Sequence, residues 1–166
     1  MTVIVALAAE RVDEVHALRV ELHRHHAAIT TPPGWVPRDE EDAWRSWRAR
    51  AAPLLHEGVA ALFVHRASAA AEPDGMALVT MLPAAELARP VLGATGEHAE
   101  LLTLVVRARA RSAGIGAALY EAAAGWARDR GAVVMHVDTR AGNVDGLRFY
   151  ERQGARPAFT QLMQPL

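Results

Sequence analysis

The chain contains no cysteine among its 166 residues. Disulfide bonds, thiolate metal sites and cysteine nucleophiles are therefore excluded. It also contains no lysine, so all 18 basic residues are arginine, and 19 acidic residues bring the formal net charge to −1. This balance argues against general binding to nucleic acid or to anionic membranes, because both need a basic surplus.

Long apolar runs are also missing. No run approaches the roughly 18 residues that a membrane-spanning helix needs, and the first residues lack the charged-then-apolar pattern of a signal peptide. We therefore expect a cytoplasmic protein. Hydrophobic residues make up 51% of the chain and charged residues 22%, which is ordinary for a globular protein. The length is enough for one domain with a real core.

Strand and helix patterns alternate along the chain. Apolar runs predict strands at 2–7, 59–66, 75–82, 100–106, 132–139 and 158–163. Helical spacing and end signals predict helices at 9–29, 39–58, 114–130 and 143–154. Residues 83–98 are expected to form a loop, and residues 73–75 a turn. This order predicts one α/β domain whose mixed central sheet has helices on both faces.

A glycine-containing stretch, RSAGIG at 111–116, lies between an apolar strand and a helix. The start of a helix leaves backbone N–H groups unpaired and carries partial positive charge, so it favours phosphate binding. Gly114 and Gly116 would let a phosphate approach the backbone, Arg111 adds a cation, and Ser112 adds a hydroxyl. The alternative is that these glycines only make the strand-to-helix turn.

Two common phosphate-binding motifs fit this stretch poorly. A Walker A loop needs a lysine followed by serine or threonine, and neither follows Gly116. A dinucleotide fingerprint needs a third small residue at fixed spacing and a strand that opens the fold, whereas this element comes late in the chain.

The stretch resembles the R/Q-x-x-G-x-G/A signature of the GNAT superfamily of acyl-CoA-dependent N-acyltransferases. Residues 99–123 (AELLTLVVRARARSAGIGAALYEAA) are similar to that family's fourth strand, pyrophosphate loop and third helix, and NVDGLRFYERQGARP (143–157) resembles its next motif. The resemblance implies a single GNAT-like domain over residues 1–166, with about six to seven strands in the sheet. Three positions depart from the family pattern, in which Ala108 is often proline, Ser112 often glycine and Gly146 usually alanine.

The resemblance further implies that acetyl-CoA is the acetyl donor and that no metal is involved. The backbone of Leu104, Val105 and Val106 would run beside the pantetheine arm, and Asn143 would hydrogen-bond near it. Arg111 would lie beside the pyrophosphate, which the backbone N–H groups of the loop would surround: Ser112, Ala113, Gly114, Ile115, Gly116 and Ala117. Arg107 and Arg109 would either meet the 3′-phosphate or lie on a solvated face, and we favour the solvated face.

Two residues are implied as catalytic. Tyr150 would lie near the thioester sulfur and protonate the departing thiolate, because a phenol pKa of roughly 10 is close to the roughly 8.5 of a thiol. Glu100 would accept the amine's proton, directly or through water. The alternatives are a tyrosine packed in the core and a solvent-exposed glutamate. His136 and Asp138 share a face of the next strand, where a structural pair is favoured over a catalytic role.

Two aromatic clusters remain. Four histidines at positions 16, 23, 25 and 26 lack a carboxylate or cysteine at metal-ligand spacing, so we expect no metal there. Trp44 and Trp47 are three residues apart on a helix, which favours packing. Trp35, in a proline-rich loop, is the better candidate for one wall of the acceptor pocket.

These observations predict an N-acetyltransferase that moves an acetyl group from acetyl-CoA to a primary amine of a small molecule or peptide, by direct attack in a ternary complex. The alternative is a non-catalytic acyl-CoA-binding module. Transfer of the acyl group to aminoacyl-tRNA would require a basic groove, which the charge balance does not indicate. We expect neither a nucleic-acid nor a membrane partner, and a homodimer is left open.

Overall fold

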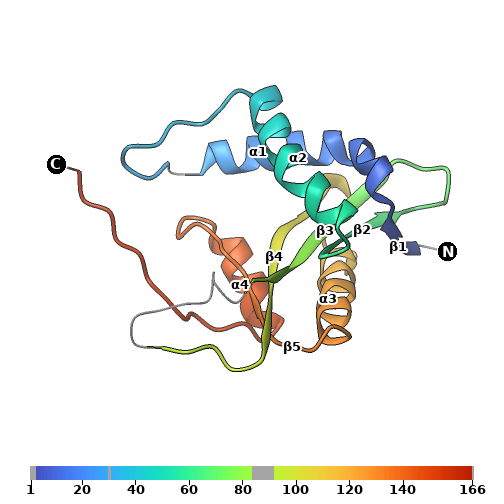
Figure 1. Cartoon of the computed structure of the whole chain (residues 1–166). Helices are drawn as coiled ribbons and strands as arrows, with labels where there is room; N and C mark the ends of the chain where they lie inside the picture. The colour runs from blue at the N-terminus through green and yellow to red at the C-terminus, as the bar shows by residue number, and fades with distance from the viewer. Residues whose placement is uncertain (1–2, 30, 84–91, 166) are drawn as a thin grey trace.

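The computed structural model describes residues 3–29, 31–83 and 92–165. Its sheet has five strands in the order β1-β2-β3-β4-β5, and neighbouring strands are antiparallel except for the parallel pair β4–β5 (Figure 1). The strands are β1 (Val3–Leu7), β2 (Ala60–Arg66), β3 (Pro73–Leu82), β4 (Glu97–Val106) and β5 (Ala132–His136).

The helices fall close to their predicted ranges. A 3₁₀ helix, η1 (Ala9–Val15), runs into α1 (His16–Ala28), and a loop with three prolines separates α1 from α2 (Glu40–His56). The Asp39 side chain begins α2 by accepting hydrogen bonds from the backbone N–H groups of Glu41 and Asp42. A short 3₁₀ turn, η3 (Ala108–Ala110), precedes α3 (Ile115–Arg128), and α4 (Val144–Arg152) follows β5. In the described ranges, no helix is both long and apolar enough to cross a membrane.

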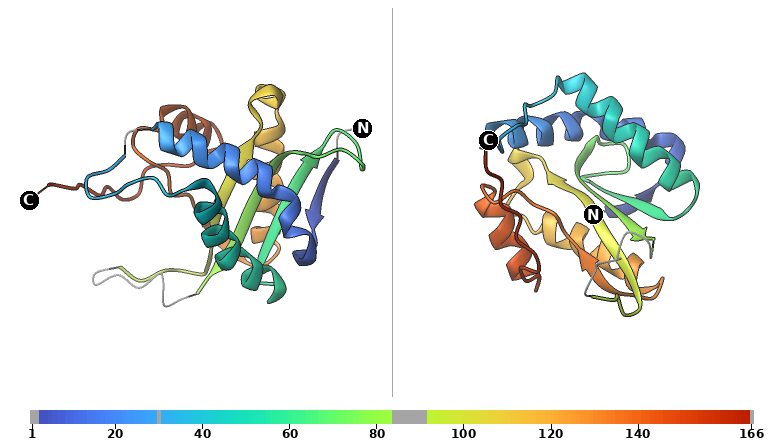
Figure 2. Two further views of the ribbon diagram at one scale, coloured as in Figure 1. Left: turned by 90° about the horizontal axis from the view of Figure 1, so that it is seen from above. Right: turned by 60° about the vertical axis from the view of Figure 1, so that its left-hand side comes forward.

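Each face of the sheet carries its own apolar core. On the face covered by α1 and α2, the core includes Leu62, Val64, Met76 and Leu78 of β2 and β3. On the opposite face, alternate residues of the same strands pack with α3, including its buried Leu119. Period-two alternation along the strands produces this division, and Figure 2 shows the two helical layers. The prediction of helices on both faces is confirmed.

A β-bulge in β4 changes the direction of its side chains. Leu78 of β3 pairs with Thr103, whereas the next residue, Val79, pairs with Leu101, so Leu102 is the extra residue. The bulge brings Glu100 and Thr103 to the same face, and both contact α2 through Arg50 and Trp47.

Beyond this bulge, β4 and β5 diverge. β5 pairs with β4 only between Glu97 and Glu100. Residues 101–106 of β4 therefore have β3 along one edge and, within the described residues, no strand along the other. The divergence leaves backbone hydrogen-bonding groups of a central strand available to a ligand.

The predicted last strand at 158–163 does not form. Within the described residues this segment pairs with no strand, and the sheet has five strands instead of about six to seven. Phe159 and Leu162 are 67% and 90% exposed. An apolar run becomes a strand only when a neighbouring edge supplies hydrogen bonds, and the segment has no such neighbour here.

Three smaller differences concern strand boundaries, and one of them is that β5 ends at His136, three residues before the predicted end at 139. The predicted turn at 73–75 is part of β3, and β4 begins at Glu97, three residues before the predicted start. Most of the predicted loop at 83–98 lies outside the described residues.

Candidate active site

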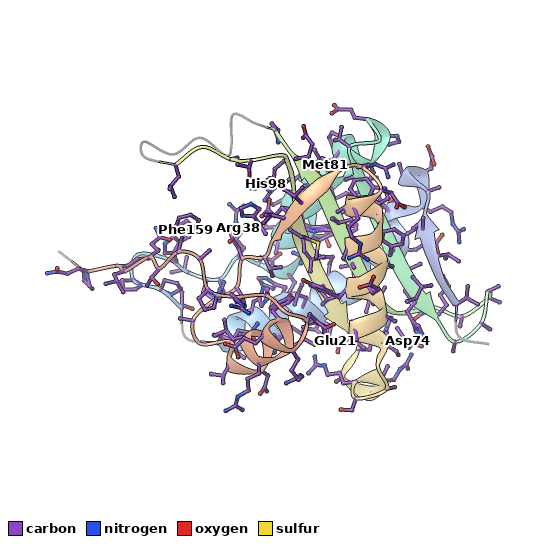
Figure 3. The ribbon with its side chains drawn as sticks, turned by 90° about the horizontal axis from the view of Figure 1, so that it is seen from below. Glu21, Arg38, Asp74, Met81, His98 and Phe159 are labelled. Carbon is purple, nitrogen blue, oxygen red and sulfur yellow. The ribbon has the colours of Figure 1, made fainter. Side chains whose placement is uncertain are left out.

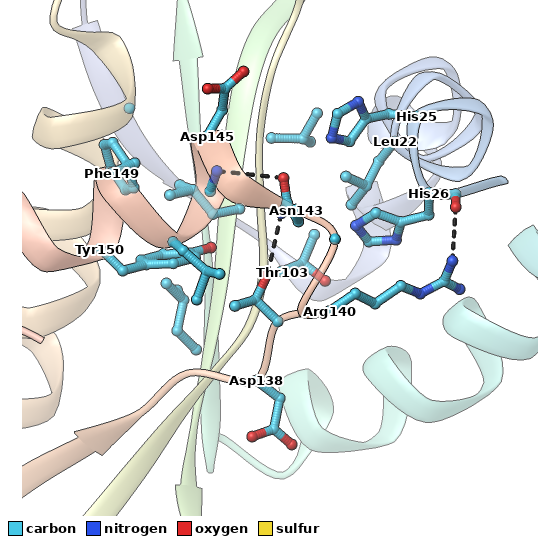
Figure 4. Close-up of a pocket in the computed structure, with 18 of the residues that line it drawn as sticks. Leu22, His25, His26, Thr103, Asp138, Arg140, Asn143, Asp145, Phe149 and Tyr150 are labelled. Atoms are coloured by element: carbon cyan, nitrogen blue, oxygen red, sulfur yellow. Dashed lines mark hydrogen bonds between the residues drawn. The ribbon is translucent and has the colours of Figure 1, made fainter. Parts of the chain in front are cut away.

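A cavity of about 1840 Å³ opens where β4 and β5 diverge. Residues 101–106 of β4 line it, and its walls come from α1, the loop before α3, the loop 138–143, α4 and the C-terminal segment 159–163. Figure 4 shows this arrangement, with Leu22 and His26 of α1 facing Asn143 and Tyr150 across the cavity. The predicted Leu104, Val105 and Val106 are all part of this lining.

The loop before α3 presents unpaired backbone donors. Gly114 has a φ of +78° and precedes the helix without a side-chain cap, and Ser112 has a φ of +64°. The first helical hydrogen bond runs from the N–H of Ala118 to the carbonyl of Gly114, at 3.0 Å. In the described part of the chain, the N–H groups of residues 112–117 have no hydrogen-bond partner. Six such donors at the positive end of a helix dipole favour the binding of an anion.

All the predicted loop residues except Ala113 line the cavity. Glycine at position 114 is favoured by its backbone conformation, because the positive φ strains any other residue. Lack of space is not the reason, since an added Cβ would meet no atom within 4 Å.

The arginines around this loop differ in their partners. Arg107 pairs with Glu72 and Arg109 with Asp74, each at 3.1 Å. The Arg109 side chain is 70% exposed, as a solvated face requires, whereas that of Arg107 is only 18% exposed. Arg111 lines the cavity, and its Nε donates to the carbonyl of Val106 at 3.1 Å. Because Arg111 has no carboxylate partner among the described residues, its charge is available to an anion held by the loop.

Asn143 lines the cavity and begins α4. Its Oδ1 accepts from the N–H of Gly146 at 3.3 Å, and its Nδ2 donates to Thr139 Oγ1 at 3.1 Å. The departure from the family pattern at Gly146 has a physical reason, because an added Cβ would overlap the Asn143 amide nitrogen and lie 2.7 Å from its Cγ. The Asn143 amide is thus oriented by the helix that it caps.

Tyr150 of α4 combines a largely buried ring with a hydroxyl on the cavity. The ring lies 5.2 Å from that of Phe149 and 6.3 Å from that of Tyr120, between centroids. Burial, followed by the nearby Tyr120, raises the pKa of Tyr150 to about 12. Among the described residues its hydroxyl has no hydrogen-bond partner, and Figure 4 shows it directed into the cavity.

Glu100 lies just beyond the cavity lining, which ends at Leu101. Its carboxylate is 3.5 Å from Arg50 of α2, and it is the register partner of His136 on β5. The expected pairing of His136 with Asp138 stays a prediction. The Nε2 atom of His136 is 2.8 Å from Nδ1 of His98, a residue that the sequence did not single out (labelled in Figure 3).

The structure brings Trp47 to the cavity and leaves Trp35 outside. Trp35 is 67% exposed and does not contribute to the lining. Trp47 lines the cavity and donates from Nε1 to Thr103 Oγ1 at 3.0 Å. The packing expected for Trp47 is also confirmed, because its ring stacks on that of Trp44 with centroids 5.5 Å apart and packs against the core beneath α1 and α2.

Three further cavity residues were missed or only partly recognised. Arg19 and His26 lie on the cavity side of α1, and Arg140 enters from the loop after β5. The spacing of Arg19, Leu22 and His26 on one helix face is the signal that identifies this stripe. No group of three or more histidine, cysteine or acidic residues within the described ranges could hold a metal ion.

Comparisons with known proteins identify the family of this chain. The model of the acetyltransferase (GNAT) family matches residues 22–155, and the chain therefore belongs to this family. No curated protein matches the chain in sequence.

Solved structures share the fold at low identity. The BH1408 protein from Bacillus halodurans, as a tetramutant, is 18% identical with a TM-score of 0.73, over 99% of both chains. A GCN5-related N-acetyltransferase from Ralstonia eutropha JMP134 is 21% identical with a TM-score of 0.72, over 100% of this chain and 99% of that one. AAC(6')-Iy in complex with the bisubstrate analog CoA-S-monomethyl-acetylneamine is 15% identical with a TM-score of 0.68, over 100% and 98%.

Proposed function

We propose that this protein transfers the acetyl group of acetyl-CoA to a primary amine of a small molecule or peptide, by direct attack in a ternary complex. The observation that carries the proposal is one cavity that joins three features. These are the unpaired N–H groups of residues 112–117, the open edge of β4 at 104–106 and the Tyr150 hydroxyl. The structure of AAC(6')-Iy, which has a similar fold and is in complex with a CoA-containing bisubstrate analog, supports the proposal.

The residues present fit acetyl-CoA. The N–H groups of 112–117 and Arg111 would hold the pyrophosphate, and the open edge of β4 would pair with the pantetheine amides as an added strand would. When bound, acetyl-CoA supplies an activated thioester. The neutral amine then forms the new C–N bond, the C–S bond breaks, the amine loses a proton, and the departing sulfur gains one.

Tyr150 is proposed to serve the departing sulfur. With a pKa of about 12, the phenol remains protonated at neutral pH. Complete transfer to a thiolate, whose acid has a pKa of roughly 8.5, is uphill by several pKa units. We therefore assign Tyr150 mainly to donating a hydrogen bond to the sulfur as negative charge develops there. Delivery of a proton to the sulfur completes the step.

Glu100 is proposed as the base, acting through water because it lies one residue beyond the cavity lining. Its carboxylate lies 3.5 Å from the Arg50 guanidinium of α2.

The proposal is tested with a panel of primary amines, acetyl-CoA and a free-thiol readout. Thiol release that depends on the amine, with an acetylated product seen by mass spectrometry, is the expected result. Tight acetyl-CoA binding without turnover on any amine would instead indicate the non-catalytic acyl-CoA-binding module.

A further inference from the structure

One wall of the cavity carries positive charge that the described residues leave uncompensated. Arg19, Leu22 and His26 occupy successive turns on the cavity side of α1. The Arg19 guanidinium lies over the Trp47 ring, 5.1 Å from its centroid. Its Nε is buried without a hydrogen-bond partner, and the side chain forms no ion pair within the described residues.

Two neighbouring arginines with exposed side chains differ from Arg19 in having carboxylate partners among the described residues. On the outer side of α1, Arg24 binds Glu40 through two hydrogen bonds of 2.7 and 2.8 Å. On α2, Arg48 binds Asp13 at 2.6 Å. These exposed side chains have carboxylate partners, whereas Arg19, which is more buried, has none among the described residues. Burying an unpaired cation is costly, so an anion from outside the chain would relieve that cost.

Arg140 adds a second cation to the same region. Its Nη1 donates to the backbone carbonyl of His26 at 2.7 Å, as Figure 4 shows, and it has no carboxylate partner in the described part of the chain. Burial, then the charges of Arg140, His25, Arg19 and His23, lower the pKa of His26 to about 4. At neutral pH, His26 is therefore neutral and the two guanidinium groups carry the local charge.

We infer that the acceptor amine carries a carboxylate, and that Arg19, together with Arg140, binds it. The inference rests on the proposed function and narrows the acceptor to amino acids and related amino-carboxylates. Asp138 and Asp145 also line the cavity but form no ion pair with either arginine within the described residues. Arg19 lies over Trp47 at the α2 side, whereas the loop at 112–117 provides a separate site for the donor's pyrophosphate.

The experiment compares acceptors in matched sets: L-leucine, L-phenylalanine and β-alanine, each against its amide. Values of kcat/KM are referred to the unprotonated amine, so that differences in amine pKa do not contribute. The wild type is expected to prefer the carboxylates by about 10- to 100-fold, the range of a charge-assisted hydrogen bond. Arg19→Gln should lose this preference, Arg19→Lys should retain part of it, and the control Arg24→Gln should keep it.

A second measurement does not need turnover or the right amine. Isovalerate and phenylacetate should bind the CoA-loaded protein in calorimetry, and Arg19→Gln should weaken that binding while CoA affinity stays unchanged. Equal use of acids and amides, or carboxylate binding that Arg19→Gln leaves intact, would overturn the inference.

A further control separates the donor from the acceptor. If Arg19→Gln weakens acetyl-CoA but not its 3′-dephospho form, Arg19 binds the donor's 3′-phosphate and the inference is wrong. Failure of the proposed function is distinct, because it would appear as no acetyl-CoA binding or no turnover on any amine.

Discussion

Tyr150 is a phenol whose burial keeps it protonated at the place where negative charge is expected to develop. Tyr150→Phe keeps the ring and removes only the hydroxyl. We expect kcat to fall by about 10- to 10⁴-fold, the range of general-acid contributions, while acetyl-CoA affinity is retained. Steady-state kinetics together with calorimetry measure both quantities.

The matched control is Tyr120→Phe. Tyr120 is the neighbouring phenol, 6.3 Å away between ring centroids, and it does not line the cavity. It should turn over at nearly the wild-type rate. Equal rates for wild type and Tyr150→Phe would remove the acid role.

His26 predicts a pH dependence of stability. Its pKa is about 4 in the folded protein, against 6.5 for the free side chain. Between these values the unfolded chain binds a proton that the folded chain does not, so the free energy of unfolding falls as pH drops from 6.5 to 4. His26→Asn should show a flatter profile in this window, measured by urea unfolding. Parallel profiles for the two proteins would contradict the burial of a neutral histidine.

At the scale of the element, two helical glycines are predicted to respond differently to substitution by alanine. In α3, a Cβ at Gly125 would meet only the Arg128 guanidinium tip, at 3.9 Å. Gly125→Ala should raise the free energy of unfolding by about 0.5–1 kcal/mol, the helix-propensity gain.

In α4, the same gain at Gly146 is offset because the new Cβ displaces the Asn143 cap, a loss of roughly 0.5–2 kcal/mol. Gly146→Ala is therefore expected to give no net stabilisation. Denaturant unfolding of both variants checks the contrast, and equal stabilisation by the two substitutions would contradict it.

The elements that the sequence predicted well are those with local signals. Helix α2 follows an Asp39 cap, and the buried run in β4 is apolar on both faces. The loop at 111–116 was identified because its glycines and its helix are contiguous in sequence. The segment 158–163 was predicted wrongly because a strand depends on a partner edge, which periodicity does not reveal.

The parts of the site that escaped prediction depend on tertiary packing. The bulge at Leu102 decides which face Glu100 and Thr103 share, and no residue type signals it. Trp47 faces the cavity only because Thr103 is opposite it, and His98 meets His136 only through the register of β4 and β5. The roles of Tyr150 and Glu100 remain predictions that the substitutions above test.

At the scale of the whole molecule, the absence of lysine has an experimental consequence. A polypeptide without lysine offers no side-chain primary amine for acetylation. After incubation with acetyl-CoA, intact-mass and peptide mass spectrometry should find no acetyl group on any internal residue, and at most one on the N-terminal amine. Amine-dependent thiol release then measures acceptor acetylation alone. Acetylation of several internal residues would contradict this expectation.

The cavity lies between two separate apolar cores, with α1 on one side and α3 and α4 on the other. Each core holds one part of the site in place. The core beneath α3 fixes the loop donors and Tyr150. The core beneath α1 and α2 fixes Trp47 and the stripe of Arg19, Leu22 and His26 on α1. The central claim is that the loop donors at 112–117 bind acetyl-CoA.

Calorimetry of acetyl-CoA binding to Gly114→Asp tests this claim most directly. Gly131→Asp is the matched control, because Gly131 has a φ of +83°, has equally open surroundings and follows the other end of α3. Both variants carry the same backbone strain and the same added charge, and circular dichroism verifies that both fold. The account predicts that Gly114→Asp lowers acetyl-CoA affinity by at least about 10-fold, as loss of a charge-assisted hydrogen bond does, while Gly131→Asp binds like the wild type. Unchanged affinity in a folded Gly114→Asp protein would contradict the account.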